Sequence, residues 1–282
     1  MFSAFLQDDI ALIHERLILT LGSKFEHNDY SGFEIQPNIR LAWTPHTNHT
    51  LWGAISRAVR SPSRLDSDIQ LKSPLSLTNA SFLTLSGNPE FDSEKLTAFE
   101  LGYRVQPHRQ VALDLAVFYN VYDDLRSLEF VNATTVLIAN QLKGETYGAE
   151  IGLNYKMMDW WRWNAGYTYL HKDLRRQPGS LDITEGASEG NDPSHQFFLR
   201  SYMDLPHDFE FDSGFRYIDY LPSPYVASYL VADMRLGWRP NRHWDISVAG
   251  QNLFRKHHQE FGPAASAHEI EQSVYGKITW RY

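Results

Sequence analysis

Apolar and polar residues alternate along most of this chain with a period of two. Between residues 111 and 119, for example, Leu113, Leu115 and Val117 take every second position and Asp114 lies among them. Successive side chains of a β-strand point to opposite faces, so this pattern predicts strands with one apolar and one polar face. The alternation runs for about 10–13 residues at a time, close to the length of a tilted strand that crosses a bilayer.

The same pattern recurs over nearly the whole chain and predicts about thirteen up-and-down antiparallel strands. We place them near residues 2–12, 15–26, 33–44, 49–60, 96–106, 110–123, 145–157, 160–171, 195–205, 208–218, 229–240, 244–255 and 271–282.

The connections between these strands alternate between short and long. Short turns fall at residues 44–48, 106–109, 157–159, 205–207 and 239–243, and long loops cover about 61–95, 124–144, 172–194, 219–228 and 256–270. Outer-membrane barrels have short periplasmic turns on one rim and long extracellular loops on the other. If Tyr282 ends in the periplasm, the short turns are expected there and the long loops outside.

The polar face carries charges where a packed core would need apolar side chains. Its members include Asp114, Glu150, Asp233, Arg235, Asp245, Lys277 and Arg281. A barrel with lipid outside and a hydrated lumen inside accounts for this face. An antiparallel sheet with one solvated face is the alternative for any single strand, and recurrence over the whole chain favours the barrel.

Composition narrows the function classes. Mean hydropathy is −0.42, and no run of about 18 apolar residues occurs, so helical membrane spans are excluded while alternating barrel strands are not. The chain has no cysteine, which excludes disulfides, thiolate metal sites and a cysteine nucleophile. A net charge of −8 argues against nucleic-acid binding.

The start of the chain has no basic segment followed by an apolar one, so the sequence contains no recognisable signal peptide. The expectation is therefore either a cytosolic chain or a fragment whose export signal lies upstream.

Several short motifs are similar to those of the TonB-dependent outer-membrane receptors. They lie at residues 56–63, 87–95, 99–104, 117–125, 144–150 and 252–256, and the chain closes on the aromatic segment 280–282. Ser93 departs from the family motif, which has proline there. Each motif is weak alone, and their order and spacing over residues 3–282 carry the resemblance.

The resemblance implies an all-β fold, in which residues 1–282 form the C-terminal part of a transmembrane barrel of the 22-stranded type. It also implies a receptor in the Gram-negative outer membrane that takes up a scarce nutrient, an iron–siderophore complex foremost. Family members carry a plug domain and a TonB-coupling segment inside the barrel. We expect both, with the first nine strands, to be missing here, so that TonB is a partner only if they exist upstream and this chain alone does not support energised uptake.

Candidate ligand-binding residues are expected only in the long loops, near Ser61, Lys95, Lys172 and Pro193. The sequence predicts no catalytic, cofactor or metal site. No His-Glu-x-x-His motif occurs, and neighbouring carboxylates such as Asp8 and Asp9 point to opposite faces of a strand. The expected partners are outer-membrane lipid and a metal chelate, and the protein is not expected to be an enzyme.

Three smaller expectations accompany these. Trp160, Trp161, Trp163, Trp238, Trp244 and Trp280 form an interfacial belt near strand ends. Glu100 and Arg104 share the polar face and could pair. His257 and His258 are an isolated pair in a loop, without a role.

Two alternatives stay open at this stage. One is a smaller passive, porin-like outer-membrane barrel, which a closed barrel with an even number of strands would favour. The other is a soluble all-β binding module, in which the face bearing Leu113, Leu115 and Val117 would be buried against a second sheet.

Overall fold

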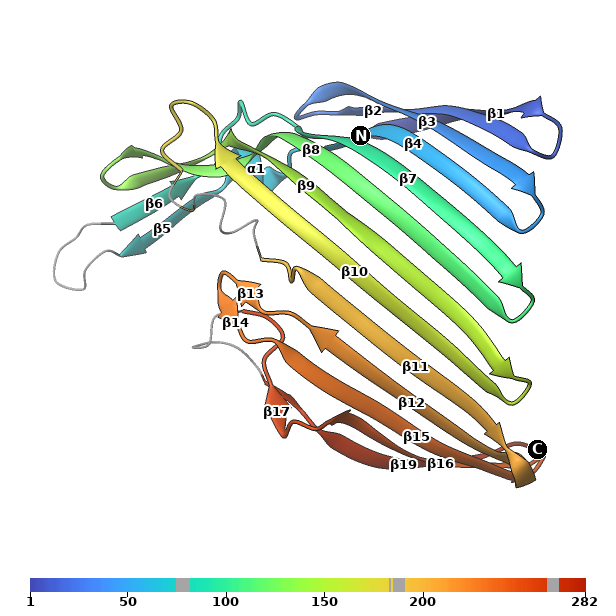
Figure 1. Ribbon diagram of the computed structural model, residues 1–282. Coiled ribbons are helices and arrows are strands. Elements are labelled where there is room, and N and C mark those ends of the chain that lie inside the picture. Colours follow the sequence, from blue (N-terminus) through green and yellow to red (C-terminus); the bar gives the residue numbers. More distant parts are fainter. Residues whose placement is uncertain (75–81, 183, 185–190, 263–268) are drawn as a thin grey trace. The chain divides into compact units, whose positions relative to one another are not determined.

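The computed structural model describes residues 1–74, 82–182, 184, 191–262 and 269–282. Thirteen long strands follow one another in chain order across one large sheet (Figure 1). They are β1 (Phe2–Ile13), β2 (Leu17–Asn28), β3 (Gly32–His46), β4 (His49–Arg60), β7 (Glu94–His108), β8 (Val111–Asn132), β9 (Thr135–Met158), β10 (Trp161–Arg176), β11 (His195–Leu205), β12 (Phe209–Ile218), β15 (Tyr229–Asn241), β16 (Trp244–Leu253) and β19 (Ser273–Trp280).

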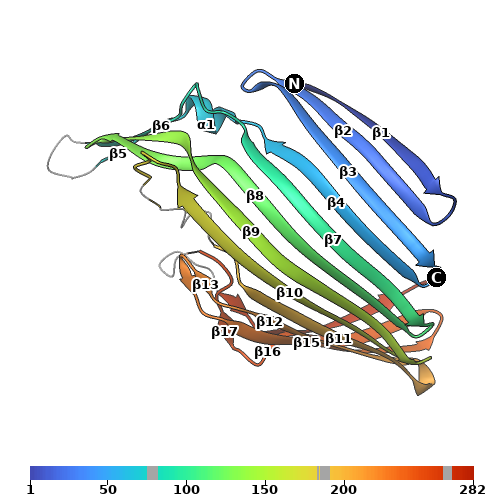
Figure 2. The same cartoon turned by 45° about the horizontal axis from the view of Figure 1, so that its top comes forward.

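The predicted strands are confirmed: each of the thirteen stretches overlaps one of these long strands. Within the described residues, the strand order begins at β1 and ends at β19, and each of these two has one neighbour in the sheet. The sheet is therefore the partial barrel wall that the sequence predicted, with up-and-down connections. The order from β1 to β10 can also be followed in the second view (Figure 2).

Smaller elements lie in the connections at one end of the sheet, which we call the loop end; the opposite end is the turn end. They are α1 (Arg64–Asp68), β5 (Gln70–Pro74), β6 (Phe82–Ser86), β13 (Leu221–Pro222), β14 (Tyr225–Val226), β17 (His257–His258) and β18 (Ile270–Glu271). At the turn end, η1 (Pro206–Asp208) forms the join between β11 and β12. Among the described residues no helix is long and apolar enough to cross a membrane.

The expected long loop at residues 124–144 is wrong. β8 and β9 continue through it and meet in a tight turn at residues 133–134. The Asn132 carboxamide oxygen accepts hydrogen bonds from the backbone N–H and the hydroxyl of Thr134, which closes the turn. β6 adds to this extension by pairing in parallel with the start of β9. The join between β2 and β3 at the loop end is also short. Short and long connections are therefore divided between the two ends of the sheet less completely than expected.

The chain divides into two compact units whose boundaries cut across β7, β8, β9 and β10. The first comprises Met1–Gly102, Val117–Tyr147 and His171–Gly190, and the second comprises Tyr103–Ala116, Gly148–Leu170 and Asn191–Tyr282. In the first unit the buried apolar side chains gather at the loop end, and they include Phe91, Val136, Ile138 and Leu142.

Large apolar side chains along the strands are exposed on one face of the sheet. Ile39, Ile55 and Leu101 keep 51%, 51% and 57% of their surface accessible. A soluble monomer rarely exposes such a contiguous apolar surface. Apart from the large sheet, the described residues form only two-stranded sheets, so no second sheet covers Val117, which is 50% exposed. This finding counts against the soluble binding module.

On the polar face, aromatic rings occupy the space next to glycines of neighbouring strands. The ring of Trp52 in β4 lies where a side chain at Gly102 of β7 would begin, and the ring of Phe198 in β11 does the same over Gly166 of β10. Any Cβ at Gly102 would overlap the indole, so glycine is required there for close packing. Each unit contains one such contact.

We predict that Gly102→Val lowers the free energy of unfolding by about 1–3 kcal/mol, because Trp52 must leave its position. Gly152→Val is the matched control, since a Cβ at Gly152 would meet only the Asp114 Cβ at 3.8 Å. Urea unfolding in lipid vesicles measures both. Adding Trp52→Ala to Gly102→Val should cost less than the two single changes together. Equal losses for the two glycine variants would contradict the packing account.

Candidate functional site

The loop end of the first unit contains a short capped helix. Ser63 caps α1, and Asp66 completes a capping box in which its Oδ2 accepts hydrogen bonds from the Ser63 N–H at 2.9 Å and the Ser63 hydroxyl at 2.8 Å. The Asp66 side chain is 1% exposed. A buried carboxylate needs compensating charge, and Arg60 at the end of β4 supplies it, with its Nη1 3.3 Å from Asp66 Oδ2.

Arg60 joins α1 to the start of β7. Its Nε donates to Glu94 Oε2, and the other oxygen of Glu94 accepts from the backbone N–H of Arg126 in β8 at 2.8 Å. The Arg60 guanidinium also lies 5.9 Å from the ring centre of the buried Phe91. One arginine therefore connects the ends of two strands, a helix and a buried ring.

A second pair lies beside the first. Lys95 Nζ contacts Asp124 Oδ2 at 2.6 Å and Asp92 Oδ2 at 3.7 Å. The Asn140 side chain of β9 donates to the carbonyl oxygens of Asp92 and Asp124 at 3.0 and 2.7 Å and accepts from the Asp92 N–H at 2.8 Å. These contacts fix the segment before β7 against β8 and β9. We call the set Arg60, Asp66, Glu94, Lys95, Asp124 and Asn140 the rim network.

The motif at residues 87–95 begins with Gly87, and the contacts of this glycine show why the position needs it. Its N–H donates to the Ile69 carbonyl at 2.7 Å, and the Asn88 N–H donates to the Asp66 carbonyl at 2.8 Å. A Cβ at Gly87 would lie 2.7–2.8 Å from backbone atoms of Ser67, Asp68 and Ile69. Only glycine allows this approach of the segment to α1.

Ser93, where the sequence departs from the family motif, is completely buried. Its N–H donates to Asp92 Oδ1 at 2.9 Å. Its hydroxyl has no hydrogen-bond partner among the described residues, so this polar group contributes no hydrogen bond to the stability of the fold.

The four residues that the sequence proposed for ligand binding fall in different settings. Ser61 directly follows β4, and its hydroxyl donates to Glu26 Oε1 of β2 at 3.0 Å. Lys95 is the second residue of β7 and belongs to the rim network. Lys172 lies inside β10, not in a loop, because that strand continues to Arg176. Pro193 lies in the loop just before β11, in the second unit.

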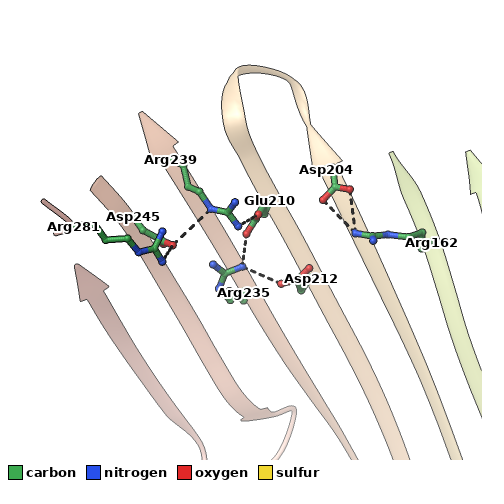
Figure 3. A network of polar contacts seen from close by, with 8 residues as sticks. All are labelled: Arg162, Asp204, Glu210, Asp212, Arg235, Arg239, Asp245 and Arg281. Carbon is green, nitrogen blue, oxygen red and sulfur yellow. Dashed lines mark hydrogen bonds and ion pairs between the residues drawn. The ribbon is translucent and has the colours of Figure 1, made fainter. Parts of the chain in front are cut away.

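The polar face of the second unit carries an arginine–carboxylate network near the turn end (Figure 3). Arg235 of β15 holds Glu210 and Asp212 of β12 at 3.0 and 3.1 Å, and Arg239 contacts Glu210 as well. Asp245 of β16 lies 3.7 Å from Arg239 and 3.5 Å from Arg281, and Arg162 pairs with Asp204 at 3.1 Å. The four arginines balance the four carboxylates, so the charges of this set cancel.

The expected pair of Glu100 and Arg104 is wrong. Arg104 Nε contacts Asp114 Oδ1 of β8 at 2.6 Å, across the hairpin. A cross-strand neighbour was closer than the residue four positions away on the same strand, because adjacent strands lie about 5 Å apart.

The six tryptophans expected in a belt lie at or near the turn end of the second unit. The ring centres of Trp160 and Trp161 lie 5.7 Å apart, and those of Trp161 and Trp163 lie 5.3 Å apart. Trp244 is the cross-strand partner of Trp280. The Trp161 indole N–H donates to Ser201 Oγ at 2.8 Å. Their placement at strand ends is as predicted.

No role was predicted for His258 from the sequence, and the structure places it in a buried cluster of the second unit. Its side chain is 1% exposed, its Nε2 lies 3.0 Å from Glu260 Oε1, and its ring centre is 4.5 Å from that of Tyr229. Arg216 reaches the same Glu260 oxygen at 2.9 Å. Burial raises the pKa of Glu260, but His258 and Arg216 outweigh burial and hold it below its usual value.

In the part of the chain that the structure describes, no group of three or more histidine, aspartate or glutamate side chains could hold a metal ion. Within the rim network, Asp66 and Glu94 contact Arg60, and Asp124 contacts Lys95.

Comparison with known proteins gives one family. A family model described as TonB dependent receptor-like, beta-barrel, matches residues 1–253. An iron-regulated outer membrane virulence protein of Vibrio cholerae serotype O1 is 23% identical over 186 residues, which are 62% of this chain and 28% of that relative.

Solved structures share the fold. A variant of the ferric enterobactin receptor of Pseudomonas aeruginosa has a TM-score of 0.78 at 20% identity over 99% of this chain and 44% of its own. The siderophore receptor PirA of Acinetobacter baumannii has a TM-score of 0.78 at 18% identity over 99% and 45%. The FrpB iron transporter of Neisseria meningitidis gives 0.75 at 12% identity over 99% and 44%. This chain therefore spans less than half the length of these proteins.

We predict that Asp66→Asn loosens α1 in a pH-dependent way. Burial raises the pKa of Asp66, but hydrogen bonds from Ser63 and the charge of Arg60 outweigh burial and lower it. A lowered pKa means that the carboxylate stabilises the fold fully above its unfolded pKa of about 3.9 and that this contribution is lost as the pH falls through the lower folded value.

Hydrogen exchange of the segment 61–69 tests this. At pH 7 the variant should exchange about tenfold faster than the wild type, and the difference in protection should vanish once the pH falls below the folded pKa of Asp66. Asp68→Asn is the control on the same helix, because the Asp68 side chain is 53% exposed. A difference that persists at the acidic pH would show that the charge of Asp66 is not responsible.

Proposed function

The chain belongs to the TonB-dependent receptor β-barrel family, and from that premise we propose that residues 1–282 form part of the barrel wall of an outer-membrane receptor for an iron–siderophore complex. The match of the family model to residues 1–253 carries the proposal. The named relatives, which include a ferric enterobactin receptor and an iron-regulated outer membrane protein, support the choice of cargo.

The two faces of the sheet support the membrane placement. Rows of exposed apolar side chains such as Ile39 and Leu101 face lipid in this proposal, and the charged face lines a hydrated lumen. The tryptophans at the turn end lie at one membrane interface, because indole rings favour the headgroup level. The turn end is then periplasmic and the loop end extracellular, in the outer membrane of a Gram-negative cell.

The loop end is where the ferric chelate binds in this proposal. In the first unit, the connections near Ser61 and Lys95 and the loop that follows β10 beyond Lys172 are candidates for these contacts, and the rim network holds the first two in place. In the second unit, the loop before β11 near Pro193 is a candidate by itself. Loops on a rigid sheet can vary for recognition while the wall stays constant. Import is driven through TonB in the whole protein, so the protein acts as a transporter and not as an enzyme.

Iron-limited growth tests this proposal in the organism that carries the gene. Deleting the gene should reduce uptake of at least one radiolabelled iron–siderophore complex by tenfold or more, and restoring the gene should recover it. Removing TonB from the complemented strain should abolish the recovery. Uptake that needs the gene but not TonB would favour the passive barrel, and unchanged uptake of every ferric siderophore would contradict the proposed cargo.

A further inference from the structure

The apolar face of the first unit is not smooth, because one strand lacks a side chain in the middle of its row. Gly53 of β4 stands between Leu51 and Ile55 on that face, opposite Leu41 of β3. A groove of about 680 Å³ opens over it. Its walls are Ile39, Leu41 and Trp43 of β3 on one side and Phe99, Leu101, Val117 and Tyr119 of β7 and β8 on the other.

We propose that this groove seats one acyl chain of a phospholipid in the periplasmic leaflet, an inference that rests on the membrane placement above. The side chains that form the walls are apolar or aromatic, and they are exposed, with Trp43 at 46% and Leu101 at 57%. Burying apolar surface in this way is favourable at about 25 cal/mol per Å². The polar group of Tyr119 is already engaged, since its hydroxyl donates to Glu145 at 2.7 Å.

The width of the groove fits a hydrocarbon chain better than a protein element. β3 and β7 flank β4, so the two walls stand about 10 Å apart, twice the spacing of adjacent strands. Carbon atoms in contact lie about 4 Å apart, which leaves room for a single chain of carbon atoms between the walls. An α-helix with its side chains is about 10–12 Å in diameter and does not enter.

The length and level of the groove fit one leaflet. From Ile39 to Trp43 the wall runs four residues along β3, on the order of 13 Å. Trp43 and Leu51 lie close to the short turn between β3 and β4, at the turn end. The indole of Trp43 thus stands at the end of the groove where a lipid headgroup would begin, as expected of an interfacial tryptophan.

Filling the groove gives a direct test, and the backbone tolerates it. A Cβ at Gly53 would meet only the Glu100 carbonyl oxygen at 3.6 Å and Leu101 Cδ1 at 3.8 Å, which are ordinary contacts. Gly53→Leu therefore fills the groove without disturbing the sheet. Gly276→Leu is the matched control, since Gly276 lies on the apolar face of β19 and a Cβ there would meet only the Ser247 carbonyl oxygen at 3.9 Å.

The 282-residue chain and both variants are reconstituted in vesicles of palmitoyl-oleoyl phosphatidylethanolamine, floated on a density gradient, and transferred to detergent for native mass spectrometry. We expect one retained phospholipid on the wild type and on Gly276→Leu, and at least a fivefold lower occupancy on Gly53→Leu.

The outcomes separate this inference from the proposed function. Protein that floats with the vesicles but retains no phospholipid, or equal retention by Gly53→Leu and the wild type, overturns the groove as a lipid site and leaves the receptor untouched. Wild-type protein that does not float with the vesicles overturns the membrane placement, and the lipid site with it.

Discussion

A strand that crosses hydrocarbon must have every backbone donor and acceptor bonded within the protein, because the lipid offers no partner. An antiparallel sheet of long neighbouring strands meets this requirement, and it leaves the side chains free to differ between the two faces. The rest of this structure depends on that separation. In the proposed membrane placement, apolar rows such as those of Ile39 and Ile55 stay exposed because lipid takes the place of a core, and the charges of Arg235 and Asp212 line the other face because water reaches it.

Where the strands emerge at the loop end, the protein has to build its own interior. The fully buried side chains Phe91, Ile138 and Leu142 gather there, beside the rim network. Arg60 matters in that setting because two of its partners come from different elements, α1 and β7. Removing it would leave the buried Asp66 without compensating charge, which costs more than losing an exposed ion pair. The glycine at position 87 then permits the close approach that the loop needs.

Periodicity predicted the strands well, since the period of two is a property of each segment by itself. It failed between residues 124 and 144, where β8 and β9 extend beyond the neighbouring strands and pair with each other, and where β9 also pairs with β6, a contact that no local pattern encodes. Lys172 was assigned to a loop for the same reason. Contacts between strands could not be predicted from the sequence either. Arg104 pairs with Asp114 on the neighbouring strand, and the fold brings Tyr229, Arg216 and Glu260 together around His258. The motif at residues 87–95 was visible in the sequence, but its reason, the approach of Gly87 to α1, required coordinates.

The separation of the two faces is the central claim, and the absence of cysteine from the chain allows a direct measurement. Single substitutions Ala112→Cys, Leu113→Cys, Leu115→Cys and Ala116→Cys in β8 are placed in lipid vesicles and exposed to a membrane-impermeant maleimide. We predict a period of two, with positions 112 and 116 labelled at least tenfold faster than 113 and 115. Equal labelling at all four positions, or faster labelling of the two leucine positions, would contradict it.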